Sequence, residues 1–119
     1  MRFRPEQHLR RQSDFRAIRE QGRRVNCGAF MLCGLRREPA TSALVRAGFV
    51  ASTSAVGAAV QRNRAKRRLR EIFRAHQDAV PAGCDVLLVA RSSLNRLASA
   101  EIARKFTDAC RQLFPAAHA

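Results

Sequence analysis

The chain has 119 residues, with 23 Lys and Arg against 9 Asp and Glu and a formal net charge of +14. Its length fits one domain with its own core, here taken as 1–119, and its charge favours a polyanionic partner. The four cysteines and three histidines form no CxxC pair and no Cys/His cluster, which argues against a zinc site. Free thiols, no signal-peptide pattern and no apolar run of membrane-spanning length together favour the reducing cytoplasm and exclude a transmembrane protein.

The N-terminal segment predicts a basic arm followed by a short helix. Residues 1–12 are rich in arginine and broken by a proline, so we expect an extended or mobile arm that orders on binding. Ser13 or Asp14 can N-cap the helix, and Gly22 can end it. The helix carries Phe15, Ile18 and Arg19.

Two extended segments follow this helix. Residues 25–35 predict one strand, or two if the run is split, and residues 38–42 predict a turn. Residues 44–52 predict a further strand with two-residue alternation. One side carries Val45, Ala47, Phe49 and Ala51, and the other carries Arg46, Gly48, Val50 and Ser52.

A strongly basic helix is predicted from about residue 58 to residue 77. Between Arg62 and Arg74 there are seven basic side chains and a single acidic one, Glu71. Helical periodicity puts an apolar stripe on one side, formed by Ala65, Leu69, Ile72, Phe73 and His76. The opposite side carries Asn63, Arg67, Arg70 and Arg74. Since a merely solvated helix usually mixes Glu with its Lys and Arg, this composition indicates an external polyanion.

The C-terminal part predicts a buried strand and a last helix. Pro81, Ala82 and Gly83 break the chain, and the continuous apolar run 85–90 is typical of a central strand covered on both faces. Residues 99–114 carry an apolar stripe at helical spacing. The order α-β-β-(β)-α-β-α predicts an α+β two-layer sandwich, with a sheet of about four strands backed by helices.

The acidic residues give no indication of a catalytic site on this chain. Nuclease chemistry needs carboxylates that hold a metal ion, or a nucleophile with its base. The nine carboxylates make no paired spacing of that kind, and the sequence has neither a P-loop nor a GxGxxG segment. We therefore expect no catalytic residue, no protein-bound metal and no organic cofactor.

The segment from Arg62 to Glu71 resembles the signature R-N-R-x-K-R-x-x-R-E of the bacterial ribonuclease P protein component. In that family it follows a strand of the form R-x-G-L/F, supplied here by residues 46–49. Further similarity lies in Asp14-Phe15, Phe30 and residues 85–91, so the resemblance covers most of residues 9–114 in the right order.

The resemblance implies a small α/β domain with a left-handed βαβ crossover. It also implies an RNA-binding subunit of a ribozyme that removes the 5′ leader of precursor tRNA, with RNA-held Mg²⁺ performing the hydrolysis. The expected partners are the catalytic RNA and precursor tRNA, with no membrane and no stable protein partner. Carried over by position, the catalytic-RNA contacts are Arg62, Asn63, Arg64, Lys66, Arg67, Arg68 and Arg70. The leader contacts are Phe15, Arg19, Met31, Cys33, Arg46, Gly48, Val50 and Arg91.

Three positions depart from the family pattern. Arg19 replaces a second aromatic one turn after Phe15, and Cys33 stands where an aromatic is frequent. Thr53 and Ser54 replace two lysines. These changes leave the basic helix intact and affect the leader cleft, where Arg19 could stack through its guanidinium in place of a ring.

Three other hypotheses compete with the ribonuclease P interpretation. A ribosomal-type RNA-binding module would share the fold and differ only in its RNA partner. A peripheral membrane protein would place the basic helix on anionic lipid. The apolar stripe, however, carries no Phe, Tyr or Trp side chain besides Phe73 that could insert into a membrane interface. A DNA-binding helix-turn-helix would need a second helix of suitable length next to the basic one.

Overall fold

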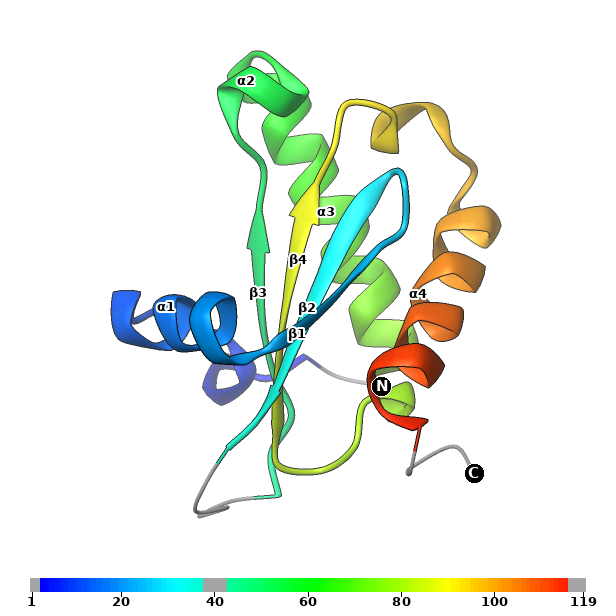
Figure 1. Ribbon diagram of the computed structural model, residues 1–119. Coiled ribbons are helices and arrows are strands. Elements are labelled where there is room, and N and C mark those ends of the chain that lie inside the picture. The colour runs from blue at the N-terminus through cyan, green and yellow to red at the C-terminus, as the bar shows by residue number, and fades with distance from the viewer. Residues whose placement is uncertain (1–2, 38–42, 116–119) are drawn as a thin grey trace.

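The computed structural model describes residues 3–37 and 43–115, which form a four-stranded sheet with helices on both faces (Figure 1). The strands are β1 (Arg23–Asn26), β2 (Phe30–Arg36), β3 (Arg46–Val50) and β4 (Cys84–Ala90). Their order in the sheet is β1-β2-β4-β3. Strand β4 pairs with β2 antiparallel and with β3 parallel, so the continuous apolar run is a central strand, as predicted.

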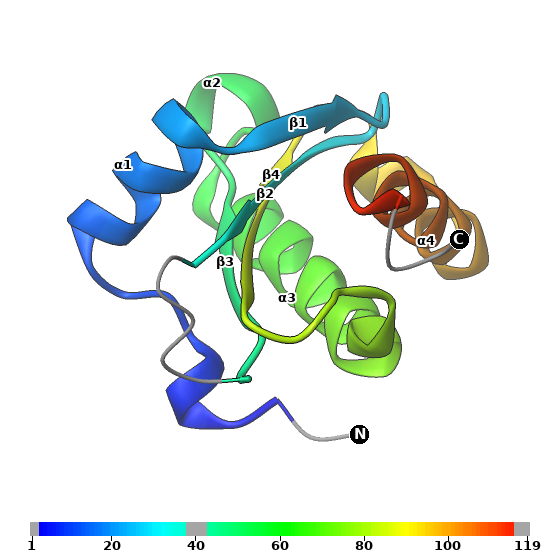
Figure 2. The same ribbon diagram turned by 60° about the horizontal axis from the view of Figure 1, so that its bottom comes forward.

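The helices lie in two layers around this sheet. They are α1 (Gln12–Gln21), α2 (Thr53–Val56), α3 (Ala59–His76) and α4 (Ser99–Leu113), with short 3₁₀ turns η1 (Pro5–Gln7), η2 (Gln77–Ala79) and η3 (Leu94–Arg96). Figure 2 shows α3 and α4 on one face of the sheet and α1 on the other. This arrangement confirms the predicted α+β class, the four-stranded sheet and the order of elements, but helices on both faces give three layers and not the predicted two. Helix α2 was not predicted; it is a single turn capped by Ser52, whose Oγ accepts from Ala55 N at 3.1 Å.

The main core lies between the sheet and the pair α3 and α4. Phe73 of α3 and Phe106 of α4 are fully buried and meet edge to face, with ring centroids 6.4 Å apart. Phe30 and Leu32 of β2 contribute from the sheet. Because each such side chain contributes about 1.5–3 kcal/mol on burial, this core fixes α3 firmly on the sheet.

The connection from β3 through α3 to β4 is left-handed. In Figure 1 both strands run upward, β4 lies to the right of β3, and α3 passes behind the sheet. Parallel βαβ units are right-handed in nearly all proteins, so this is a rare topology, and it is the one that the family resemblance implies.

Two local expectations need correction. The N-cap of α1 is Arg11, without a side-chain cap bond, and not Ser13 or Asp14. Gly22 does end the helix, but at φ −79° and not in the left-handed conformation. Glycine is required there by close approach, since a Cβ would lie 2.4 Å from the carbonyl oxygen of Ile18.

The first extended run is divided into two strands by a tight turn. Gly28 has a φ of +80°, which favours glycine, and its N–H donates to Asn26 Oδ1 at 2.9 Å. The alternative of a split run is therefore the right one. The turn predicted for residues 38–42 lies outside the described residues.

The N-terminal arm packs on the fold from Phe3 onward, although the sequence predicts an extended or mobile segment. Gln7 is buried, and its Nε2 donates to Val45 O at 3.0 Å and to Gln77 Oε1 at 2.8 Å. Leu9 N donates to Ala47 O at 3.0 Å. Charge and a proline suggested mobility, but these few buried groups attach the described part of the arm to β3 and to the end of α3.

Candidate RNA-binding surfaces

Helix α3 has the two faces that the sequence predicts. Ala65, Leu69, Ile72 and Phe73 are buried, whereas His76 is half-buried at the edge of the stripe. Asn63, Arg67 and Arg70 of the predicted polar face are exposed, as is Arg64, whereas Arg74 is half-buried and pairs with Glu71 at 2.8 Å. A row of guanidinium groups on a helix that the core holds in place is suited to bridging phosphates, because each presents a planar fork of donors.

Other basic residues of α3 are bound within the protein. The Arg68 guanidinium donates to Leu94 O at 2.8 Å and also to Leu97 O, and Arg62 donates to Thr53 Oγ1. Lys66 is half-buried. The Arg70 guanidinium lies 5.7 Å from the ring centroid of Phe49. The basic residues of this helix therefore differ in how much of their hydrogen-bonding capacity faces outward, which their spacing alone does not reveal.

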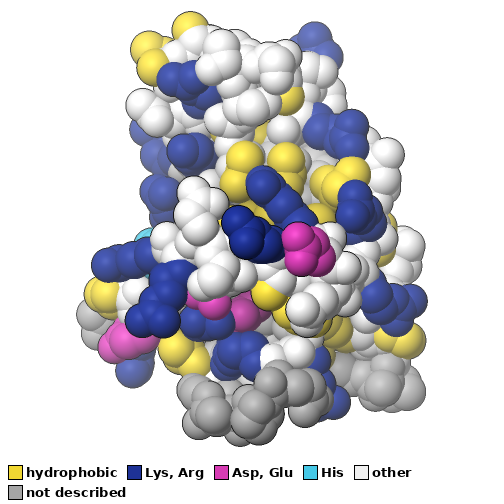
Figure 3. Space-filling view, turned by 60° about the vertical axis from the view of Figure 1, so that its left-hand side comes forward, with side chains coloured by type: hydrophobic (Ala, Val, Ile, Leu, Met, Phe, Trp, Pro, Cys, Tyr) yellow, Lys and Arg dark blue, Asp and Glu magenta, His cyan; other side chains and the backbone are white. Residues whose placement is uncertain are grey.

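A second cluster of apolar residues lies between α1 and the sheet face opposite α3; we call it the sheet-face cluster. Its buried members are Leu9, Ile18, Cys33 and Leu87, and its partly buried members are Phe15, Met31, Leu35, Val50 and Val89. It thus brings together four of the residues predicted to hold a leader: Phe15, Met31, Cys33 and Val50. Figure 3 shows apolar side chains exposed in the middle of one face of the molecule, bordered by Lys and Arg.

Phe15 lies directly over the glycine of the predicted strand motif. A Cβ atom at residue 48 would lie 2.7 Å from Cε1 and 3.0 Å from Cζ of the Phe15 ring. Ile18 is 1% exposed and Leu9 7%, so these two side chains are buried between α1 and the sheet while the Phe15 ring is half-buried. Gly48 therefore provides the space that the edge of the Phe15 ring occupies against the sheet.

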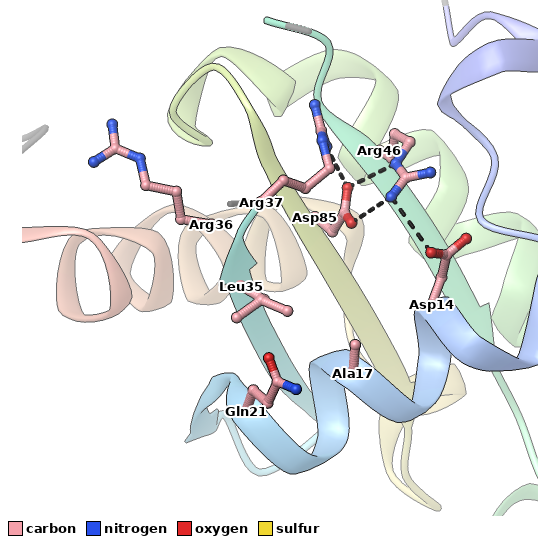
Figure 4. A pocket seen from close by; sticks show the side chains of 8 residues that line it. All are labelled: Asp14, Ala17, Gln21, Leu35, Arg36, Arg37, Arg46 and Asp85. Carbon is pink, nitrogen blue, oxygen red and sulfur yellow. Dashed lines mark hydrogen bonds and ion pairs between the residues drawn. The ribbon is translucent and has the colours of Figure 1, made fainter. Parts of the chain in front are cut away.

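Arg46 is held in an ion-pair network that the sequence did not predict. Its Nε and Nη2 donate to the two oxygens of the buried Asp85 at 2.9 and 2.7 Å (Figure 4). Arg37 also pairs with Asp85, and Arg46 Nη2 lies 3.6 Å from Asp14 Oδ1 on α1. The hydrogen bond to Asp85 is the main reason that the pKa of Arg46 is raised.

A pocket of about 490 Å³ adjoins this network. Its lining comes from α1 and from the ends of strands β2, β3 and β4, as Figure 4 shows. Of the predicted leader contacts only Arg46 lines it, and Arg46 is already bound to Asp85. The pocket and the exposed apolar surface around Phe15 are thus neighbouring but separate features.

The remaining predicted contacts lie at the margins of the sheet-face cluster. Arg19 is exposed on α1, and Arg91 is exposed just after β4, where its N–H donates to Ala29 O at 2.9 Å. Sequence reasoning missed Arg24, which donates to Arg19 O at 3.4 Å and pairs in register with Cys33. It also missed Val89, although two-residue alternation from Leu87 within the last strand puts it on the same face.

The titratable groups bear on metal binding and on thiol reactivity. In the described ranges, no three His, Cys, Asp or Glu side chains converge as around a metal ion. Burial raises the pKa of the Cys27 thiol to about 11 and that of Cys110 to about 12, which keeps both protonated and poorly nucleophilic. Within these same residues no helix is both long and apolar enough to cross a bilayer.

A model of the family described as Ribonuclease P matches residues 3–113 of the chain. The chain belongs to the bacterial ribonuclease P protein family. It is 41% identical over 87 residues to the ribonuclease P protein component of Oleidesulfovibrio alaskensis, covering 73% of this chain and 68% of the relative. It is 38% identical over 98 residues to that of Acidothermus cellulolyticus, covering 82% and 80%.

Solved structures of the family share the fold. The RNase P protein from Thermotoga maritima superposes with a TM-score of 0.75 at 25% identity, covering 88% of this chain and 96% of that one. The Staphylococcus aureus RNase P protein gives a TM-score of 0.74, at 24% identity, over 89% and 94%. Family membership makes the chain the protein component of the ribonuclease P holoenzyme, an endoribonuclease. It also implies tRNA processing, with ribonuclease P RNA and precursor tRNA as partners, by a metal-dependent RNA enzyme.

Proposed function

We propose that this subunit docks on the catalytic RNA through the exposed face of α3, with Asn63, Arg64, Arg67 and Arg70 as its central contacts. The burial of Leu69 and Phe73 supports this proposal, because it fixes the helix and leaves the arginine face outward. Arg62, Lys66 and Arg68 lie on the same helix but are half-buried, so we assign them a flanking role. An excess charge of +14 favours association with a polyanion at long range.

The sheet-face cluster is the proposed binding site of the 5′ leader. The observation that carries this assignment is the Phe15 ring, half-buried over Gly48 on a partly exposed apolar surface. Unpaired bases stack on such rings and gain about 1–3 kcal/mol each. Met31, Cys33 and Val50 form the floor beside the ring, while Arg19 and Arg91 at the margins are available to backbone phosphates.

The chemistry is proposed to belong to the RNA. Mg²⁺ held by the RNA partner would activate water and stabilise the leaving oxygen, as metal ions do in phosphodiester hydrolysis. The protein's part is to position the leader and to reduce repulsion between RNA strands. Arg46 has a supporting role in this scheme, because its bonds to Asp85 and Asp14 attach α1 to the sheet next to Phe15.

Replacement of Phe15 by alanine tests the leader site. In the reconstituted holoenzyme, Phe15→Ala should weaken binding of precursor tRNA by about ten- to a hundredfold through the lost stacking. Binding of mature tRNA, which has no leader, should stay unchanged. All measurements need one fixed salt concentration, because phosphate contacts shift affinity steeply with salt.

Phe114 provides a matched control. It is also half-buried over a sheet glycine, since a Cβ at residue 34 would lie 2.7 Å from its Cζ, but it packs on the α4 side. Phe114→Ala should therefore lower the melting temperature without changing the affinity for precursor tRNA relative to that for mature tRNA. Equal losses for both tRNAs in Phe15→Ala, or a large drop in its folding stability, would return Phe15 to the core and refute the leader site.

A further inference from the structure

The connection between β4 and α4 is bound to the side of α3 at two points. Arg68 donates to the carbonyl oxygens of Leu94 and Leu97, and the Asn95 amide donates to Gln61 O at 3.1 Å and to Gln61 Oε1 at 3.3 Å. Figure 1 shows the turn η3 at the same end of the molecule as α2 and the start of α3. A segment that is distant in sequence thus becomes part of the surface beside the basic helix.

Arg68 is engaged differently from the exposed arginines of the helix. It occupies a position that the family signature leaves open. Its guanidinium donates hydrogen bonds to two carbonyl oxygens at the ends of η3. Arg68 is half-buried, and burial, followed by the nearby charge of Arg64, lowers its pKa. The position of Arg68 on the helix suggests an RNA contact, but its hydrogen bonds clamp η3 to α3.

Arg96 lies between these attachment points and is exposed. Its chain neighbours on both sides, Asn95 and Leu97, are the residues bonded to α3. Its backbone position is therefore fixed relative to the helix, while its side chain is open to solvent. Arg68 lies one helical turn after Arg64 on α3, so the bonds of its neighbours hold Arg96 beside the flank that carries Arg64.

We infer that Arg96 is a further phosphate ligand for the catalytic RNA and that Arg68 is a positioning residue that presents it. This inference rests on the proposed docking of α3 on that RNA. A fixed backbone lowers the entropy that an arginine loses on binding, which is why the anchored Arg96 should contribute more than an equally exposed arginine elsewhere. The ligand is a backbone phosphate of structured RNA, recognised by charge and by the guanidinium fork.

The test measures affinity for the in vitro transcribed ribonuclease P RNA over a series of monovalent salt concentrations at fixed Mg²⁺. Arg96→Ala should weaken binding by about five- to tenfold at low salt and reduce the slope of log affinity against log salt by about one. Its melting temperature should not change, because the side chain is exposed. Arg104→Ala, at an exposed arginine of α4, removes the same charge and should leave affinity and slope unchanged.

A double-mutant cycle tests the role of Arg68. Arg68→Met removes the clamp, so on its own it should lower affinity by no more than Arg96→Ala does. The double variant should bind as Arg96→Ala binds, because Arg68 then has nothing left to position. If the double variant binds more weakly than Arg96→Ala and its slope of log affinity against log salt falls by about two, Arg68 contacts RNA directly and the positioning role is wrong.

Arg67→Ala, measured alongside, separates this inference from the proposed function. The inference fails, while α3 remains the docking helix, if Arg67→Ala weakens RNA binding and Arg96→Ala does not. It fails in the same way if Arg104→Ala reduces the affinity as much as Arg96→Ala does. If Arg67→Ala has no effect on affinity or slope, the proposed docking face itself is wrong.

Discussion

Gly48 shows how a single missing side chain can set the geometry of an apolar surface. The Phe15 ring occupies the space where a Cβ would be, and Leu87 Cδ1 lies 3.3 Å from that same point. One side of the ring therefore packs against β3 beside Leu87 of the central strand β4. Val50 and Met31 lie in the same cluster, so the position of the ring decides the shape of the apolar surface.

Gly48→Ala should displace the Phe15 ring without removing it. The added methyl group would come within 2.7 Å of the ring, which must then shift or tilt. We expect the preference of the holoenzyme for precursor over mature tRNA to fall towards that of Phe15→Ala. The double variant Gly48→Ala/Phe15→Ala should lose no more of this preference than Phe15→Ala alone, because the glycine acts through the ring.

Gly34→Ala is the control for this experiment. It displaces Phe114 on the opposite side of the sheet by the same kind of contact, with a Cβ 2.7 Å from Cζ. Its effect should be limited to stability. A loss of leader preference in Gly48→Ala that adds fully to that of Phe15→Ala would mean that the glycine contacts the leader independently.

At the scale of elements, α3 turns an apolar face to the core and a basic face to solvent. Leu69→Ala or Ile72→Ala should reduce the free energy of unfolding by about 2–5 kcal/mol, because each leaves a cavity in the core. Arg67→Ala should change stability little and weaken RNA binding, since its side chain is exposed. Urea unfolding and RNA binding of the same variants check this division, and a similar loss of stability in Arg67→Ala and Leu69→Ala would contradict it.

The N-terminal arm carries a pH-sensitive contact with this helix. The His8 ring stacks on Phe3 with centroids 3.9 Å apart. Burial, then the charges of Arg70 and Arg10, lower the pKa of His8 below 6.5. The folded state therefore binds a proton less readily than the unfolded state, so stability should fall as the pH drops from 6.5 through the lower pKa of the folded protein.

His8→Gln should flatten this part of the stability profile. The variant has no proton to bind at this position, whereas the wild-type chain loses stability over that window. Thermal melts at a series of pH values, with both chains at the same ionic strength, provide the measurement. Identical slopes for the two chains would show that His8 is equally protonated in the folded and unfolded states.

The long elements could be predicted because their periodicity is strong, and the short ones could not. Helix α3 and the strand β4 each carry an apolar pattern over most of their length, which the structure confirms. Helix α2 has only four residues, too few for a pattern. The packing of the arm depends on Gln7, a polar residue whose burial rests on partners 38 and 70 residues away in the sequence.

At the scale of the whole molecule, the sequence predicts which residues gather but not what each one does. Phe15, Met31, Cys33 and Val50 do meet in one cluster, because helix and strand periods put them on facing surfaces. The bonds of Arg46 to Asp85 and of Arg68 to the η3 carbonyls join segments distant in the chain, so no local spacing indicates them. Family membership then assigns the assembly, a ribonucleoprotein endoribonuclease.

The charge of the whole chain leads to the last prediction. The purified protein should cleave no precursor tRNA alone, and should lower the Mg²⁺ concentration at which its RNA partner reaches half-maximal cleavage. A net charge of +14 can replace part of the cation atmosphere that otherwise screens repulsion between the catalytic RNA and its substrate. Cleavage of precursor tRNA by the RNA alone, by the protein alone and by both, over a Mg²⁺ series, provides the measurement. Metal-dependent cleavage by RNA-free protein that a single Asp or Glu substitution abolishes would contradict this division of labour. An unchanged Mg²⁺ requirement in the holoenzyme would mean that the protein contributes leader binding and not charge screening.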